Sequence, residues 1–68
     1  MDKLHEIADE QALLFYAGEV TIAEATVTIH AALDPEYCRE NPQTSWQWAR
    51  ELFYEALDHI ERGAEVGN

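Results

Sequence analysis

Cysteine and the common metal-binding and catalytic motifs are scarce in this chain. Its 68 residues include one cysteine, Cys38, so no disulfide can form within the chain, and a reducing compartment such as the cytoplasm is expected. The sequence has no CxxC, HExxH or Glu-x-x-His spacing and no glycine-rich phosphate loop. We therefore expect no cofactor, no metal site and no enzyme activity.

Basic residues and long apolar runs are also scarce. Four Lys and Arg residues stand against fourteen Asp and Glu, which gives a net charge of −10. Such a surface repels phosphates, so direct nucleic-acid or membrane binding is not expected, whereas a basic protein partner would be attracted. The longest low-charge stretch, residues 20–33, contains Glu24 and is too short to span a membrane, and no signal-peptide pattern is present.

The chain is small for an independent domain. A domain of this length buries only about 60% of its unfolded surface, so a monomer would be marginally stable. Without a disulfide or a metal, self-association is the simplest compensation, and we expect a homodimer in which residues 1–63 form one domain and residues 64–68 a frayed tail.

The strongest structural signal is an amphipathic helix over residues 46–62. Thr44 and Gln47 have the capping-box spacing at its start, and Gly63 suits a left-handed residue just past its end. Trp48 and Tyr54 do not fit its apolar face. Trp48 could be covered by neighbouring segments of its own chain or could contact a partner, because aromatic residues are enriched at interface hot spots. The apolar residues on one side of this helix are Trp46, Ala49, Leu52, Phe53, Ala56, Leu57 and Ile60.

Two further helices are expected upstream. Residues 2–17 show helical periodicity and stop at Gly18, with Leu13 and Tyr16 forming a second apolar spot. Residues 20–33 are rich in β-branched side chains, yet Thr21 and Glu24 form a capping-box spacing. We favour a helix, with a short β-hairpin over residues 20–31 as the alternative. This central helix is apolar nearly all round, which indicates burial on more than one side, by neighbouring helices or a second subunit.

A short helical turn should connect the central and last helices, because Asp34 suits a cap and Pro35 a first helical position. It would expose Tyr37, Arg39 and Glu40. These residues could bind a partner, or Tyr37 could simply cover the core edge while Arg39 balances nearby acids.

The sequence thus predicts an all-α fold: a small bundle of two long helices plus a central apolar helix, assembled as a homodimer. His30, on the central helix, is expected to be a buried or half-buried histidine with a hydrogen-bond partner. Two surface pairs are expected on the last helix, Glu55 with His59 and Asp58 with Arg62. The residues expected to form the core or the dimer interface are Ile22, Ile29, Leu33, Leu52, Phe53, Leu57 and Ile60.

The acidic composition, the capped helices, the Tyr37-Cys38-Arg39-Glu40 connection and the WQW sequence at residues 46–48 resemble the small early proteins with which phages inhibit host machinery. In size and helical character the chain is similar to the anti-quorum-sensing anti-activators of Pseudomonas phages. The resemblance implies a helical homodimer in the host cytoplasm that sequesters a LuxR-type transcription activator, and with it the pilus assembly ATPase as a second target.

The expected function is therefore a protein-binding inhibitor or adaptor. The residues expected to contact the partner are Tyr37, Arg39, Glu40, Trp48 and Tyr54. Two alternatives remain open: an acidic DNA mimic that inhibits a nuclease or a CRISPR complex, and a structural or assembly module whose aromatic residues serve only self-assembly.

Overall fold

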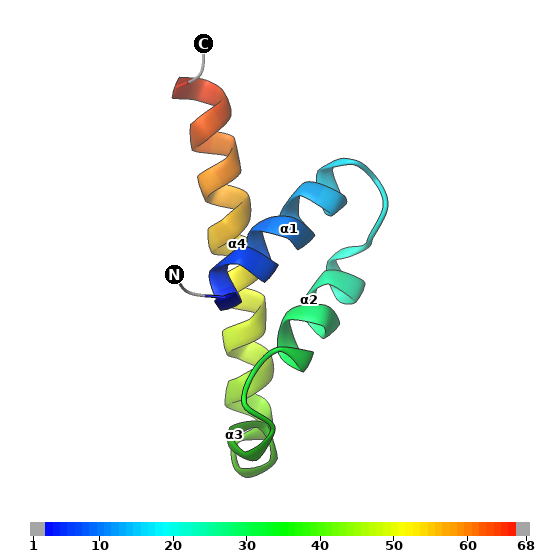
Figure 1. The fold of residues 1–68 in the computed structure, drawn as a ribbon, viewed down its shortest axis with the longest axis vertical. Coiled ribbons are helices and arrows are strands. Elements are labelled where there is room, and N and C mark those ends of the chain that lie inside the picture. The colour runs from blue at the N-terminus through cyan, green and yellow to red at the C-terminus, as the bar shows by residue number, and fades with distance from the viewer. Residues whose placement is uncertain (1–2, 67–68) are drawn as a thin grey trace.

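Four helices make up the part of the chain that the structure describes, which in this computed structural model is residues 3–66, with side chains placed over residues 3–63. They are α1 (Lys3–Tyr16), α2 (Ile22–Ala31), α3 (Pro35–Glu40) and α4 (Pro42–Val66) (Figure 1). The prediction of an all-α fold is confirmed. No strand occurs within residues 3–66, and the hairpin alternative for residues 20–31 is not adopted because α2 occupies this stretch.

Helix α4 runs along the long axis of the molecule, and α1 and α2 pack against it (Figure 1). Helix α3 lies at the start of α4, and α1 and α2 also contact each other. The principal extents are 44 × 24 × 17 Å, and the radius of gyration is 12.4 Å. A compact domain of this length would have a radius of gyration of about 11 Å. The chain is therefore elongated, because α4 extends beyond the helices that cover it.

The turn after α1 shows why the chain reverses at Gly18. Gly18 has φ of +78°, a left-handed conformation that glycine adopts without strain. The N–H of Glu19 donates to the Leu14 carbonyl (2.9 Å), and the N–H of Gly18 donates to the Phe15 carbonyl (3.0 Å). These two bonds form a Schellman motif, so the predicted stop at Gly18 is confirmed.

The capping box predicted for α2 is present. The Glu24 backbone N–H donates to the Thr21 hydroxyl oxygen (3.1 Å), and the Thr21 N–H donates to the Glu24 carboxylate (2.8 Å). Inside the helix, the hydroxyls of Thr26 and Thr28 donate to the carbonyls of Ile22 and Glu24. The threonine hydroxyls are thus hydrogen-bonded within the helix, although β-branched side chains generally favour strands.

Helix α3 is capped as predicted, since the Asp34 carboxylate accepts from the Tyr37 N–H (3.3 Å) and Pro35 begins the helix. Helix α4, in contrast, extends beyond both predicted ends. It begins at Pro42, which places Thr44 inside the first turn, so the capping box predicted for Thr44 and Gln47 is wrong. Proline has no N–H to leave unpaired, and its fixed φ suits a first helical position.

At the other end, α4 continues through Gly63 to Val66, so Gly63 is not the left-handed residue that ends the helix. Residues 64–66 of the predicted frayed tail thus have a helical backbone. Residues 67–68 of that tail lie outside the described residues.

The core lies where α1, α2 and α4 meet. Small side chains dominate it, and they let the helices approach closely around the two largest fully buried apolar side chains, Phe53 and Ile29. Phe15 packs edge to face against Phe53, with ring centroids 5.7 Å apart. Leu57 and Ile60 pack at the margin of this core. Ile22, which is expected in the core or the dimer interface, lies outside the core and is exposed, as is Trp46. The buried apolar residues are Ala8, Ala12, Ala25, Ile29, Leu33, Ala49, Leu52, Phe53 and Ala56.

Candidate protein-binding surfaces

The residues expected to bind a partner fall on two separate surfaces. Trp48 contacts Tyr37 at the junction of α3 and α4, where Arg39 and Glu40 are exposed nearby in sequence. Tyr54 instead lines a groove between α2 and α4. The structure therefore brings Tyr37 and Trp48 together and separates them from Tyr54.

The first surface is centred on the Tyr37–Trp48 pair. Their rings meet edge to face, with centroids 5.7 Å apart and planes at 82°. Tyr37 is half-buried, and Trp48 remains 38% exposed. The two side chains thus partly cover each other and still present aromatic surface to solvent.

Capping interactions at both ends of α3 fix the position of Tyr37. Its N–H donates to the Asp34 carboxylate, as described above. Its carbonyl accepts from the Asn41 backbone N–H (2.9 Å) and from the Asn41 side-chain amide (3.3 Å). A six-residue helix is too short to be stable alone, so these bonds and the contact with α4 hold it in place. The aromatic pair is therefore preorganised.

Carboxylates dominate the charge around this pair. Glu36 and Glu40 are exposed on α3, and Glu51 is exposed one turn after Trp48 on α4. Arg39 is the only basic residue of α3 and makes no ion pair within residues 3–63. An aromatic pair beside several carboxylates can bind a cationic side chain, because the ring faces and the carboxylates both attract positive charge.

The second surface is the α2–α4 groove, which we define by its lining residues. From α4 come Trp46, Arg50 and Tyr54, which are spaced one turn apart along one side of the helix. From α2 come Ile22, Ala23, Thr26 and Val27. The groove is therefore largely apolar, and Arg50 carries its only formal charge.

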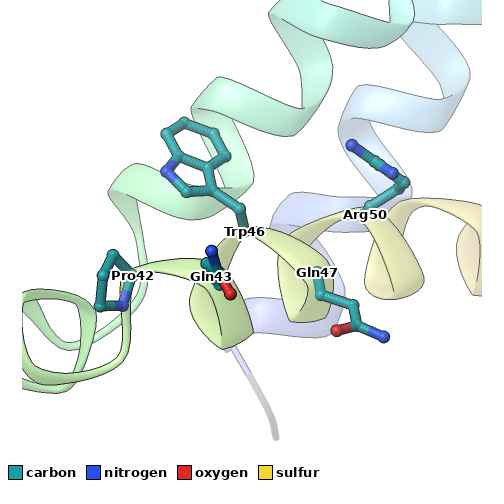
Figure 2. A pocket seen from close by; sticks show the side chains of 5 residues that line it. All are labelled: Pro42, Gln43, Trp46, Gln47 and Arg50. Atoms are coloured by element: carbon teal, nitrogen blue, oxygen red, sulfur yellow. The ribbon is translucent and has the colours of Figure 1, made fainter.

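Trp46 and Arg50 also border a second hollow at the start of α4, together with Pro42, Gln43 and Gln47. Figure 2 shows the side chains of Trp46 and Arg50 projecting toward α2, whereas Gln47 points away from it. Trp46 and Arg50 thus border both hollows.

His30 fixes the position of Trp46 beside α2. The imidazole and indole rings are stacked, with centroids 3.7 Å apart and planes within 4°. His30 Nε2 lies 2.9 Å from the Ser45 hydroxyl oxygen, and that hydroxyl donates to the Pro42 carbonyl (2.9 Å). Because the only hydroxyl proton of Ser45 is used there, the Ser45 oxygen accepts a hydrogen bond from the Nε2–H of His30. The predicted half-buried histidine with a hydrogen-bond partner is confirmed.

A third exposed patch combines the end of α1 with α4. Leu13, Tyr16, Ile60 and Glu61 line it, so the second apolar spot predicted for Leu13 and Tyr16 is confirmed. Desolvation, a hydrogen bond to Glu61 and the charge of that carboxylate raise the pKa of the Tyr16 hydroxyl above its ordinary value. Tyr16 remains about half exposed, so the effect on stability is modest.

Of the two surface pairs predicted on α4, one is present in the structure and the other is not. Arg62 Nε lies 3.1 Å from an Asp58 carboxylate oxygen, which confirms that pair, although both side chains are well exposed and such pairs contribute little to stability. His59 and Glu55 form no ion pair in the structure, so that prediction is wrong.

The structure shows no arrangement suited to a metal ion in the region it describes, since no three His, Cys, Asp or Glu side chains there are grouped for binding one. None of the helices within residues 3–66 has the length and apolar character needed to cross a membrane. Compared with known proteins, the chain matches no protein-family model, no curated protein and no solved structure.

Proposed function

We propose that this chain is a non-enzymatic inhibitor or adaptor that binds a basic surface of another protein through the Tyr37–Trp48 pair. One observation carries the proposal: two helices contribute one aromatic ring each to a partly exposed, edge-to-face pair that lies among carboxylates. Aromatic side chains supply much of the binding energy at protein interfaces, and carboxylates around them favour a cationic partner.

The net charge of the chain would also speed the association of a basic partner with this surface. At −10, the chain attracts basic partners over distances of about a Debye length, roughly 8 Å at physiological salt. Such steering raises the association rate, whereas the desolvated aromatic contact slows dissociation. A partner held in this way would be blocked from its other ligands without any chemical step.

The resemblance to phage anti-activators supplies the first target to test, the DNA-binding domain of a LuxR-type transcription activator. Such a domain must present basic side chains to DNA phosphates. An acidic protein that covers this face would prevent DNA binding. The proposed setting is therefore the host cytoplasm, with the activator as the sequestered partner.

Isothermal titration calorimetry with a purified LuxR-type DNA-binding domain tests this proposal. Trp48→Ala should weaken binding by about 10-fold or more, as truncation of an aromatic hot spot does. Gln47→Ala is the matched control, because Gln47 is exposed and directly precedes Trp48, so its side chain leaves α4 about 100° away from that of Trp48. Absence of binding by the native chain would reject this target, and equal losses in both variants would reject the assigned surface.

The acidic charge also favours a second candidate, DNA mimicry toward a nuclease or a CRISPR complex. In that case the carboxylates, rather than Trp48, would carry the binding energy. Affinity would then fall steeply as salt is raised, whereas recognition through the aromatic pair should persist at moderate salt. The salt dependence of binding by the native chain and by Trp48→Ala separates the two functions.

A further inference from the structure

We propose that the α2–α4 groove binds an amphipathic helix of another protein, and that Arg50 pairs with a carboxylate on the apolar face of that helix. This second site takes a ligand of different chemistry from the basic surface proposed for the Tyr37–Trp48 pair. The proposal does not rest on the proposed function, because the two surfaces share no residue.

Apolar side chains that a partner could cover are exposed on both walls of the groove. The exposed fractions are 42% for Ile22 and 55% for Val27 on α2, and 41% for Trp46 and 49% for Tyr54 on α4. Thr26, which also lines the groove, is buried, and its hydroxyl already donates to the Ile22 carbonyl (2.8 Å). An apolar face laid into the groove would therefore leave no threonine hydroxyl without a partner.

The walls of the groove suit a helix better than an extended strand. Both walls are helices, whose backbone groups are largely engaged within each helix, so they offer no edge to which a strand could be added. Trp46, Arg50 and Tyr54 follow one another at intervals of one turn and span about 12 Å of α4. Side chains of a third helix can pack between such a row and the exposed residues of α2.

Arg50 determines what the bound helix must carry. Its side chain projects toward α2 (Figure 2), and it makes no ion pair within residues 3–63. Arg62, in contrast, pairs with Asp58 one turn earlier on α4. A purely apolar face would cover the Arg50 guanidinium without pairing it, whereas a carboxylate at that point would offset the loss of hydration. The residues one turn before and after Arg50 on α4 include no acid: Trp46, Gln47, Phe53 and Tyr54.

The charge of the whole chain restricts the rest of the bound helix. At −10, the chain repels a helix that carries several acids, so the outer side of the ligand should be neutral or basic. Trp46 and Tyr54 lie one turn before and after Arg50, so the ligand should have an apolar residue about one turn on each side of its acid. The expected ligand is thus an amphipathic helix with a single carboxylate in the middle of its apolar face.

Two matched peptides test this site by isothermal titration calorimetry at moderate salt. The probe is a helical peptide of about 16 residues, built from alanine and lysine, with one glutamate and a leucine one turn on each side of it. Its control has glutamine in place of the glutamate. The glutamate peptide should bind the native chain at least about 3-fold more tightly. General attraction to the acidic chain would favour the glutamine peptide, which is more positive, so the expected preference identifies a local cationic contact.

Three variants show where this preference arises. Arg50→Gln should abolish it, because the carboxylate then has no cationic partner. Arg62→Gln is the matched control, since it removes the same charge from α4 outside the groove and should keep the preference. Val27→Glu places an acid on the exposed apolar wall of α2 and should weaken both peptides at least about 10-fold. Circular dichroism of each variant verifies that the helices remain.

The indole N–H signals locate the bound peptide. In an NMR titration with the glutamate peptide, the Trp46 signal should shift while the Trp48 signal stays in place. A shift of Trp48 alone would place the peptide on the other surface and overturn the proposal.

Several other results would also overturn the proposal. Failure of the native chain to bind either peptide would reject the groove as a helix-binding site. Equal affinities for the two peptides, or a preference that persists in Arg50→Gln, would reject the pairing with Arg50. A native dimer in sedimentation equilibrium that buries Trp46 and excludes the peptide would show that a second copy fills the groove. A chain that binds the glutamate peptide but no basic protein would leave this proposal standing and reject the proposed function instead.

Discussion

The imidazole of His30 lies flat against the indole of Trp46, with ring centroids 3.7 Å apart and planes within 4° of parallel. This stack joins the end of α2 to the start of α4 and keeps Trp46 on the α2 side. Residues two apart on a helix point about 200° apart. Trp48 must therefore face away from α2, and it meets Tyr37 of α3. The WQW sequence thus supplies one tryptophan to each of two surfaces.

Ser45 should contribute more to stability than its neighbour Thr44. Ser45 is fully buried, and its hydroxyl links His30 to the Pro42 carbonyl. We expect Ser45→Ala to lower the free energy of unfolding by about 1–2 kcal/mol, because the His30 N–H loses its acceptor in a half-buried site. Thr44 is exposed inside the first turn of α4, so Thr44→Ala should change stability by less than about 0.5 kcal/mol. Urea denaturation measures both values.

A loss of about 1 kcal/mol for Thr44→Ala would restore Thr44 as the helix cap and contradict the start of α4 at Pro42.

Two glycines should respond in opposite directions to alanine. An added methyl group would meet nothing within 4 Å at Gly18 or at Gly63. Gly18 has a left-handed backbone, so Gly18→Ala should cost roughly 1 kcal/mol. Gly63 lies within α4, so Gly63→Ala should stabilise the helix by up to about 1 kcal/mol. Thermal denaturation of the two variants tests this, and destabilisation by Gly63→Ala would show that α4 ends at Gly63.

The sequence could predict the helices because their signals are local. Thr21 with Glu24, Asp34 with Pro35, and the left-handed Gly18 each specify a helix end within a few residues, and all three occur as predicted. The two ends of α4 were harder to predict from the sequence. Thr44 satisfied a capping pattern, but Pro42 begins the helix two residues earlier.

The candidate site was only partly predictable. Helical periodicity shows that Trp48 lies off the apolar face of α4. The spacing of Tyr37 and Trp48 in the sequence, however, does not show that the two side chains contact each other. Trp46 fits the apolar arc of α4 by its spacing, yet its side chain is 41% exposed. Its stack with His30, sixteen residues earlier in the chain, forms only when α2 packs against α4. Contacts between helices that are distant in sequence leave no periodic pattern.

Phe53 should be a major determinant of stability. It is fully buried and packs edge to face against Phe15. Phe53→Ala should cost about 3–5 kcal/mol through lost burial and the cavity left behind. Tyr54→Ala is the adjacent control, because Tyr54 is about half exposed, and it should cost much less in a urea titration of the monomer. Similar losses at both positions would show that the core has been misassigned.

Tyr16 should make stability fall at alkaline pH. Desolvation and Glu61 raise the pKa of the folded-state hydroxyl above the unfolded value of about 10. A group with a raised folded pKa stabilises the fold below its unfolded pKa, and this contribution is lost as pH rises through the folded pKa. Between pH 9 and about 11, the urea midpoint of the native chain should therefore fall more than that of Tyr16→Phe. Tyr54→Phe is the control variant, and equal slopes for the native chain and Tyr16→Phe would contradict the role of Glu61.

The most direct test of the central claim follows the two indole N–H signals by NMR. Trp46→Phe and Trp48→Phe assign these signals, and the ¹⁵N-labelled native chain is then titrated with an arginine- and lysine-rich peptide at moderate salt. Binding at the Tyr37–Trp48 surface should shift the Trp48 signal and leave the Trp46 signal in place. A shift of Trp46 alone, or no shift of either indole while the peptide binds, would contradict the account.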